Sequence, residues 1–378
     1  MAFDRKKIIR FFTWKRLLVP IVIGLGVAVW LFLDDFDVDV FKGWRWGYQA
    51  LLCIIIAAVL QVSRDIFYML RLRVLTEGQL GWRQSFEVVM LWEFASALTP
   101  SVVGGSAIAF FIIEREGISL GRSTAIVLIT AFLDEMFYLI MAPLVIAIVG
   151  FGGLFDMERS TAIFGMEMGL KTLFYAGYGF ILLLNGFIGY GIFFNPKGLK
   201  KILVAVFRLR ILKRWRGQAE RVGDDIVTTS VEMKKKPFSF WMKAASTTFI
   251  SWTARFLVVN FLIVGAWYLK GSGSLEAIPI IGDGAQWLIY AKQLIMWIVL
   301  MISPTPGGSG VAEYLFSDFL APFIPSGLSS SLAVLWRLLS YYSYLIIGLI
   351  VFPLWIRRVF SRKHLKKIQG REGKRIDF

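Results

Sequence analysis

Long apolar runs separated by short polar segments dominate the pattern of this chain. Several runs reach the roughly 20 residues that an α-helix needs to cross a bilayer, and Lys and Arg concentrate in the segments between them. The pattern predicts an all-α fold, a polytopic helical membrane protein with one transmembrane domain over residues 1–378. The expected full spans are 17–33, 44–62, 120–149, 170–194, 240–269 and 328–356.

The basic residues orient these spans, because membrane proteins concentrate Lys and Arg in their inner loops. The strongly basic segments are residues 5–16, a loop with Arg64, Arg71, Arg73 and Arg83, the segment 196–237 and the tail 357–378. All of them fall on one side of the membrane if both termini are cytoplasmic. We therefore expect a multi-pass protein of the inner (plasma) membrane.

The segment 196–237 is the only long polar piece of the chain. Its first part mixes apolar residues such as Ile202 and Val206 with Lys200 and Lys201. Two interpretations are open, an interfacial helix on anionic lipid or an ordinary inner loop, and we favour the loop. The expected partner of the basic stretch 197–236 is an anionic lipid surface.

One stretch breaks the apolar C-terminal third, since residues 303–313 read Ser-Pro-Thr-Pro-Gly-Gly-Ser-Gly-Val-Ala-Glu. Proline lacks the backbone donor that a helix needs, and glycine loses the most chain entropy on ordering. At membrane depth such a break survives only where protein or a wet cavity shields it. We expect a re-entrant hairpin over 286–323, broken at Pro304, Pro306, Gly307, Gly308 and Gly310.

A second stretch of the chain is similar to this break. Leu98-Thr-Pro-Ser-Val-Val-Gly-Gly-Ser-Ala matches it with a small gap, which predicts a hairpin over 85–113 broken at Pro100, Gly104 and Gly105. The first hairpin enters from inside and the second from outside, so the repeats, about 85–194 and about 239–356, are inverted. Inverted repeats with broken helices are a transporter pattern, with the site at the repeat interface.

Charged residues inside the apolar segments supply the candidate chemistry. Each costs about 2.5 to 3.5 kcal/mol at the centre of a lone membrane helix, so we expect them to face the bundle interior and to pair. Arginine suits a phosphate or diphosphate head group because its guanidinium offers two parallel donors. Structural ion pairs are the alternative for every one of them, and Glu93 is the weakest candidate. The expected substrate-binding residues are Arg337, Glu313, Arg255, Lys292, Asp134 and Glu135.

Composition narrows the function classes. The chain is 57% hydrophobic, and its mean hydropathy is +0.66. The net charge of +16 does not indicate nucleic acid, because the basic residues lie beside apolar runs. With one Cys and one His, we expect no disulfide framework, no metal site and no cofactor.

The same motifs resemble those of a known family. Pro304-Thr-Pro-Gly-Gly-Ser-Gly-Val-Ala-Glu313, Thr99-Pro-Ser-Val-Val-Gly-Gly105 and Trp336-Arg-Leu-Leu-Ser-Tyr-Tyr342 resemble the lysylphosphatidylglycerol synthase transmembrane, or flippase-like, family. The resemblance covers nearly the whole chain. It implies a relation to the membrane half of bacterial proteins that aminoacylate phosphatidylglycerol and move the product across the bilayer.

Two departures limit what the resemblance implies. Nothing after Ile356 matches a soluble aminoacyl-transferase domain, so we do not expect the synthase activity. Where many relatives have an acidic and a basic residue after the first Gly-Gly, this chain has Ser106 and Ala109, which argues against a lysyl head group.

The leading hypothesis is a lipid flippase that moves a phospholipid or a polyprenyl-linked lipid through a cavity between the two hairpins. The alternative is a membrane-embedded transferase or hydrolase with Asp134, Glu135 or Glu313 as general base. A third interpretation is a membrane partner of a separate lipid-modifying enzyme. No nucleophile elbow or phosphate loop is visible, so we favour transport over an enzyme.

Overall fold

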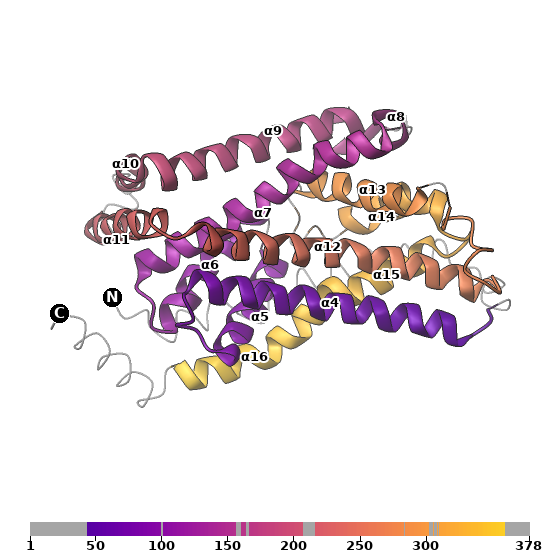
Figure 1. Cartoon of the computed structure of the whole chain (residues 1–378), viewed down its shortest axis with the longest axis horizontal. Helices are drawn as coiled ribbons and strands as arrows, with labels where there is room; N and C mark the ends of the chain where they lie inside the picture. Colours follow the sequence, from indigo (N-terminus) through magenta and orange to yellow (C-terminus); the bar gives the residue numbers. More distant parts are fainter. Residues whose placement is uncertain are drawn as a thin grey trace.

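Long helices running side by side build the molecule (Figure 1). A computed structural model describes residues 44–99, 101–155, 160–163, 166–206, 216–282, 284–301, 305, 308 and 310–359. The first expected span, 17–33, lies outside the described residues. Within the described part, five helices are long and apolar enough to cross a membrane, which confirms a multi-pass helical protein.

The five candidate spans are α4 (Tyr48–Leu75), α7 (Leu120–Val149), α9 (Leu170–Gly189) with the π-helical η1 (Tyr190–Phe194), α12 (Phe238–Leu269), and the run of α15 (Ser329–Arg337), η4 (Leu338–Tyr342) and α16 (Ser343–Val359). Their outer faces carry exposed apolar side chains, for example Ile55 and Val59 on α4 and Leu183 on α9. Such faces suit hydrocarbon, since lipid tails are as apolar as these side chains. Along most of its length α4 packs against α12 (Figure 1).

Two pairs of shorter helices lie between the spans. They are α5 (Trp82–Leu98) with α6 (Ser101–Arg115), and α13 (Ala285–Leu300) with α14 (Val311–Leu320), the latter followed by the 3-10 turn η3 (Ala321–Phe323). The members of each pair pack against one another. In Figure 1 the α5–α6 pair lies toward the end of the bundle that carries α11, whereas α13 and α14 lie toward the opposite end.

The break in the second pair includes two glycines with left-handed backbone, Gly308 at φ +69° and Gly310 at φ +84°. Glycine adopts this conformation without the steric cost that other residues have, so these two residues allow the chain to turn between α13 and α14. The predicted break residues Pro100, Pro304, Pro306 and Gly307 lie outside the described residues.

The first pair breaks earlier than the sequence indicated. Gly104 and Gly105 lie inside α6, which already begins at Ser101, so their assignment to the break is wrong. Gly105 instead permits close packing of α6 on α5, because a Cβ there would lie 2.8 Å from the Cα of Ser96. A glycine in a helix interior lowers helix stability by about 1 kcal/mol relative to alanine, but at this position it allows the two helices to approach closely.

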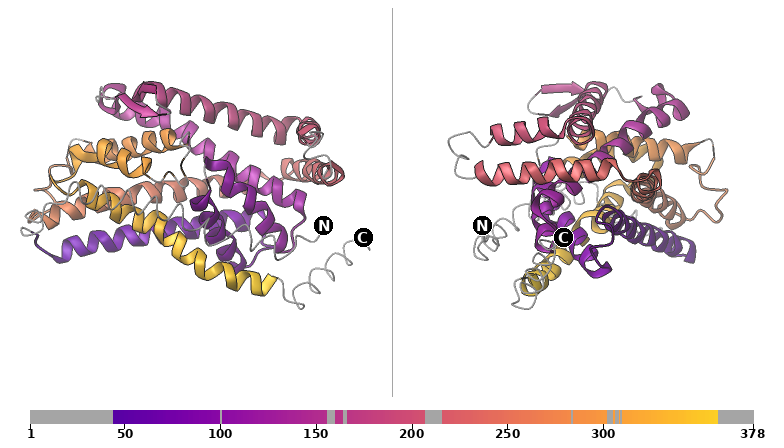
Figure 2. Two further views of the ribbon diagram at one scale, coloured as in Figure 1. Left: turned by 180° about the vertical axis from the view of Figure 1, so that it is seen from behind. Right: turned by 60° about the vertical axis from the view of Figure 1, so that its left-hand side comes forward.

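The basic segment after the third described span is helical. It forms α10 (Pro196–Val206) and α11 (Arg216–Lys234), so the interpretation as an ordinary loop is wrong for these residues. No residue of α10 is buried, whereas α11 packs on α7. Both helices lie together at one end of the bundle (Figures 1 and 2).

The remaining short elements follow α7. They are the single helical turn α8 (Phe151–Leu154) and an antiparallel hairpin of β1 (Ser160–Ile163) and β2 (Met166–Gly169), in which Ser160 pairs with Gly169. They lie at the end of α9 that is distant from α10, as the strand arrows in Figure 2 show. Apart from this hairpin, the fold is all-α as predicted.

Candidate functional site

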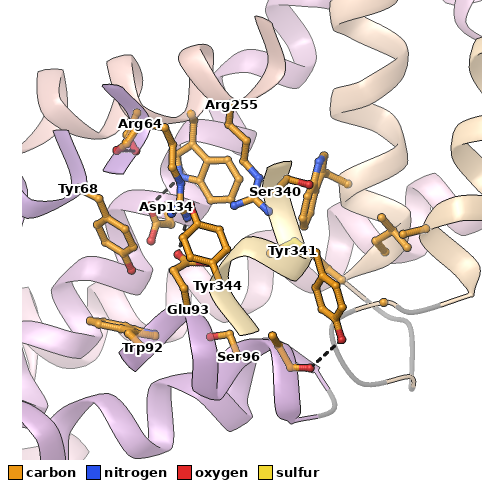
Figure 3. Close-up of a pocket in the computed structure, with 18 of the residues that line it drawn as sticks. Arg64, Tyr68, Trp92, Glu93, Ser96, Asp134, Arg255, Ser340, Tyr341 and Tyr344 are labelled. Carbon is orange, nitrogen blue, oxygen red and sulfur yellow. Dashed lines mark hydrogen bonds and ion pairs between the residues drawn. The ribbon is translucent and has the colours of Figure 1, made fainter. Parts of the chain in front are cut away.

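A cavity of about 220 Å³ lies in the middle of the bundle (Figure 3). Among the described residues, its wall is formed by the second break and by helices α4, α5, α6, α7, α12, α13, α14, α15, η4 and α16. Charged groups dominate the lining, together with the aromatic residues Tyr68, Trp92, Tyr138, Trp252, Trp297, Tyr341 and Tyr344. The charged lining residues are Arg64, Arg71, Arg255, Arg337, Glu93, Asp134 and Glu135.

Both helix breaks contribute to the cavity wall. Thr99, which ends α5, lines it from the first pair, and Thr305 and Gly308 line it from the second. The π-helical segment η4 adds Ser340 and Tyr341. Single π turns inside helices occur frequently at functional sites. The cavity is thus the place where the irregular backbone of the described chain meets the buried charges.

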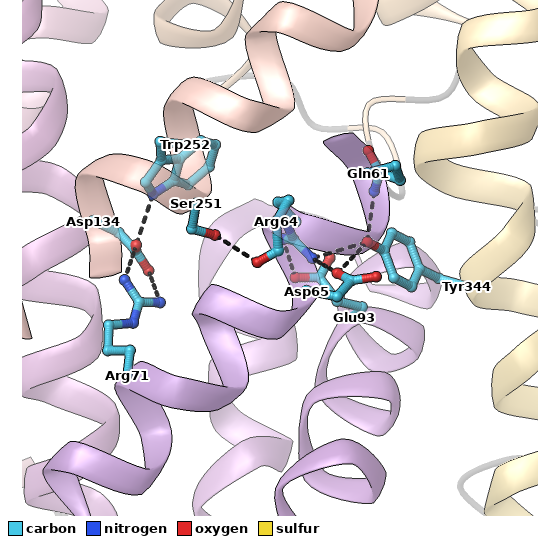
Figure 4. A network of polar contacts seen from close by, with 9 residues as sticks. All are labelled: Gln61, Arg64, Asp65, Arg71, Glu93, Asp134, Ser251, Trp252 and Tyr344. Atoms are coloured by element: carbon cyan, nitrogen blue, oxygen red, sulfur yellow. Dashed lines mark hydrogen bonds and ion pairs between the residues drawn. The ribbon is translucent and has the colours of Figure 1, made fainter. Parts of the chain in front are cut away.

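A first network is centred on Arg64 of α4 (Figure 4). Its guanidinium donates to Asp65 at 2.7 Å, to the Tyr344 hydroxyl at 2.9 Å, and to Glu93 of α5. The Tyr344 hydroxyl donates in turn to Asp65 at 2.6 Å and accepts from Gln61 at 2.7 Å. These bonds tie α4, α5 and α16 together on one side of the cavity.

A second network is centred on Asp134 of α7 (Figure 4). Arg71 binds both carboxylate oxygens, at 2.5 Å and 3.1 Å, and donates to Thr248 at 3.0 Å. The indole N–H of Trp252 donates to the same carboxylate at 2.7 Å. Charge-assisted bonds of this bidentate kind are about twice as strong as neutral ones. They fix α4, α7 and α12 relative to one another.

The third charged pair joins α14 to α15. Glu313 is completely buried and accepts from Arg337 Nε at 2.8 Å. Its other oxygen accepts from the Gly310 N–H at 2.8 Å, which caps the start of α14. The Arg337 guanidinium lies 3.8 Å from the centre of the Tyr341 ring. Glu313 therefore positions both Arg337 and the break, although it does not itself line the cavity.

Arg255 of α12 differs from the other three cavity arginines. Its guanidinium carbon lies 4.3 Å from the centre of the Trp297 ring and 5.4 Å from that of Trp252. Among the described residues no carboxylate lies within ion-pair distance of it, and its Nε has no hydrogen-bond partner there. Figure 3 shows it reaching into the pocket from α12. A buried cation held only by indole rings is suited to receive an anion.

The structure brings together most of the residues predicted from the sequence. Arg255, Arg337, Asp134 and Glu135 line the cavity, and Glu313 contacts it through Arg337. Lys292 does not line it, since it is buried on α13 with its ammonium 5.8 Å from the centre of the Phe323 ring. Glu93, ranked last from the sequence, does line it.

Two cavity residues were assigned to the wrong element. Arg64 and Arg71 were expected in an inner loop, but α4 continues to Leu75 and buries both of them. The apolar run ends near Val62 because beyond that point the helix faces the polar cavity as well as lipid. The spacing of Gln61, Arg64, Tyr68 and Arg71 was the available signal, since it places all four side chains on one helical face.

The donor set of the cavity favours the binding of an anion. Within the described part of the chain, no group of three or more His, Cys, Asp or Glu side chains is arranged to hold a metal ion. The carboxylates are instead engaged by arginine, apart from Glu135. The arrangement can bind an anionic group at Arg255 and position a head group among aromatic rings.

Comparison with known proteins shows the family of this chain. The profile of the family described as Lysylphosphatidylglycerol synthase TM region matches residues 17–348. A UPF0104 membrane protein of Archaeoglobus fulgidus is 26% identical over 346 residues, covering 88% of this chain and 95% of the relative. No solved structure matches. Because the profile spans most of the sequence, the chain belongs to the family of lysylphosphatidylglycerol synthase TM regions.

Proposed function

We propose that this protein is a flippase that moves a lipid with a phosphate-bearing head group between the two leaflets. The observation that carries the proposal is Arg255, a buried guanidinium that lines the cavity without a carboxylate partner among the described residues. A buried charge without its counter-ion is costly, so the site favours an anion there. The family description, a lysylphosphatidylglycerol synthase TM region, agrees with a lipid substrate.

In this proposal the α5–α6 and α13–α14 pairs are re-entrant hairpins related as an inverted repeat. The two pairs lie toward opposite ends of the bundle (Figure 1), and both breaks contribute residues to one cavity. Broken helices that meet near the membrane midplane are the arrangement of many secondary transporters. Rocking of one pair against the other opens the cavity alternately to each leaflet, while the phosphate stays on Arg255.

The same proposal places α10 and α11 on the cytoplasmic side, in accordance with their basic residues. Exposed Ile202 and Val206 share α10 with Lys200 and Lys201. An unburied helix of this composition lies in the interface plane, where each basic residue near anionic lipid contributes about 1 kcal/mol. Anionic lipid on that leaflet would hold α10 close to the start of the transport path.

A leaflet-exchange assay tests the proposal. The purified full chain is reconstituted into vesicles that contain a head-group-labelled lipid at a series of concentrations, either a phospholipid or a sugar-headed lipid without phosphate. We compare the wild type with Arg255→Gln and with Arg357→Gln, a matched change at an exposed arginine of α16. A lost charge-assisted bond is worth about 1.5 to 3 kcal/mol, or roughly 10- to 150-fold in affinity.

The wild type and Arg357→Gln should speed exchange of the phospholipid only, and Arg255→Gln should need a correspondingly higher substrate concentration for the same rate. If no lipid class exchanges faster than in empty vesicles, the protein is not a flippase. If Arg255→Gln matches the wild type at every substrate concentration, the phosphate does not bind at Arg255.

A further inference from the structure

Glu135 is the exception among the buried carboxylates of the described chain. It lies on α7, is 2% exposed and lines the cavity. It makes no hydrogen bond or ion pair with any described residue, and its buried Oε2 has no partner there. The other carboxylates of the bundle interior each contact an arginine, namely Asp65, Glu87, Glu93, Glu116, Asp134 and Glu313.

The surroundings of Glu135 disfavour a negative charge on it. A carboxylate that leaves water without a counter-ion binds a proton, because the neutral acid is much less costly to bury. Asp134, the next residue, is paired with Arg71 and accepts a hydrogen bond from Trp252. Two neighbouring carboxylates repel one another, so the position of Glu135 beside Asp134 further disfavours a negative charge on Glu135.

The described charged and titratable groups around Glu135 lie on several helices. The charged residues that share the cavity wall are Arg64, Arg71, Arg255, Arg337, Glu93 and Asp134. The tyrosines are Tyr68, Tyr138, Tyr341 and Tyr344. On α13, which also packs on α7, Tyr290 and Lys292 do not line the cavity. Three of the four cavity arginines are engaged by other carboxylates, so among the described residues of the cavity wall Arg255 is the cation available to an incoming anion.

We propose that Glu135 binds a proton together with the anionic head group, so that each lipid crosses the membrane accompanied by a proton. This inference rests on the proposed function, because it uses the phosphate on Arg255. A phosphate there and a carboxylate at Glu135 repel one another in the same poorly solvated cavity, so binding of the lipid and of the proton favour each other.

The proton steps balance without any further reactant. With the cavity open to the acidic side, the Glu135 carboxylate takes a proton from water and becomes a neutral carboxylic acid as the lipid enters. With the cavity open to the alkaline side, the O–H bond breaks, the proton passes to water and the lipid leaves. Neither charge then remains alone in the cavity during the crossing.

The first test imposes a pH difference on vesicles that contain the full chain and a trace of labelled phospholipid. One proton per lipid supports about a tenfold enrichment of the label per pH unit, in the leaflet that faces the alkaline side. The direction does not depend on how the protein is inserted, because it is set by equilibrium. Glu135→Gln should equilibrate the label but show no enrichment, whereas Glu232→Gln, a matched change on exposed α11, should behave as wild type.

Equal distribution of the label in wild-type vesicles, or equal enrichment with Glu135→Gln, would overturn the inference and leave the flippase standing. Enrichment in the leaflet facing the acidic side would also overturn it. Infrared spectroscopy gives a readout independent of transport. With phospholipid bound, the C=O stretch of a protonated carboxyl should be present at neutral pH in the wild type and missing in Glu135→Gln, and its absence from the wild type would contradict a proton site. No lipid movement at all would instead remove the proposed function.

Discussion

The pair of Glu313 and Arg337 offers the sharpest test of how the second break is held. Both side chains are almost completely buried, at 0% and 4% exposure, and the Arg337 Nε to Glu313 Oε1 distance is 2.8 Å. Removing one partner of such a pair costs about 3 to 5 kcal/mol, because a buried charge loses its counter-ion. For Glu313→Gln we expect the lower end, about 3 kcal/mol, since the amide oxygen still accepts one hydrogen bond.

Glu313 also caps α14, and this role can be tested separately from its ion pair with Arg337. Glutamine at this position can still accept from the Gly310 N–H, as in an ordinary capping box, whereas alanine cannot. Glu313→Ala should therefore lose about 1 kcal/mol more than Glu313→Gln, the usual value of a helix cap. A double variant with Arg337→Met should be less destabilised than the sum of its single changes, because no uncompensated charge remains.

The chain provides its own probe for this measurement. Its single cysteine, Cys53, is buried in α4. A thiol-reactive fluorogenic dye added to the detergent-solubilised protein therefore reports thermal unfolding at one defined position. If Glu313→Gln unfolds at the wild-type temperature, or if the single and double changes add exactly, the pair does not stabilise the break and the reasoning is wrong.

Two further predictions concern other contacts. Gly348→Ala should destabilise the protein by about 1 to 3 kcal/mol, because the new Cβ would lie 2.2 Å from Phe94 Cγ. Helix propensity alone would predict the opposite, a stabilisation of about 1 kcal/mol. Thermal unfolding checks this, and Phe94→Ala in the same chain should remove the extra cost. Hydrogen bonding from Lys236, with the nearby Arg122, lowers the pKa of Glu77. Glu77 therefore stabilises the fold at every pH above the ordinary pKa of a glutamate, and this stabilisation disappears as the pH falls through the lower pKa of the folded state. The wild type and Glu77→Gln should therefore converge in unfolding scans only at acid pH.

Much of the fold could be predicted from hydropathy, because lipid-facing helices must be apolar along their whole length. The prediction lost accuracy where helices face protein. The C-terminal half of α4 carries Arg64 and Arg71, and averaging hydropathy over a window that contains these charges predicts a loop there. α10 and α11 were missed for a related reason, since a polar helix at an interface has no apolar run.

The charged residues of the candidate site could be predicted from the sequence, but their pairing could not. Buried charges in apolar runs identified Asp134, Glu135, Arg255 and Arg337, because each is too costly to face lipid. Which of them are neutralised depends on partners far away in the sequence, such as Arg71, 63 residues before Asp134. The unmatched state of Glu135 is therefore visible only once the helices are packed.

The π-helical segment η4 sets the rotational phase between α15 and α16. Tyr344, Gly348 and Trp355 occupy one buried stripe of α16 that begins just after it. An α-helix turns by about 100° per residue, so deletion of one residue within 338–342 would rotate that stripe by roughly a quarter turn relative to Arg337. Such a deletion would direct polar and aromatic contacts toward lipid, although every residue of the stripe would be unchanged. The length of this short segment is thus as much a part of the cavity as the side chains that line it.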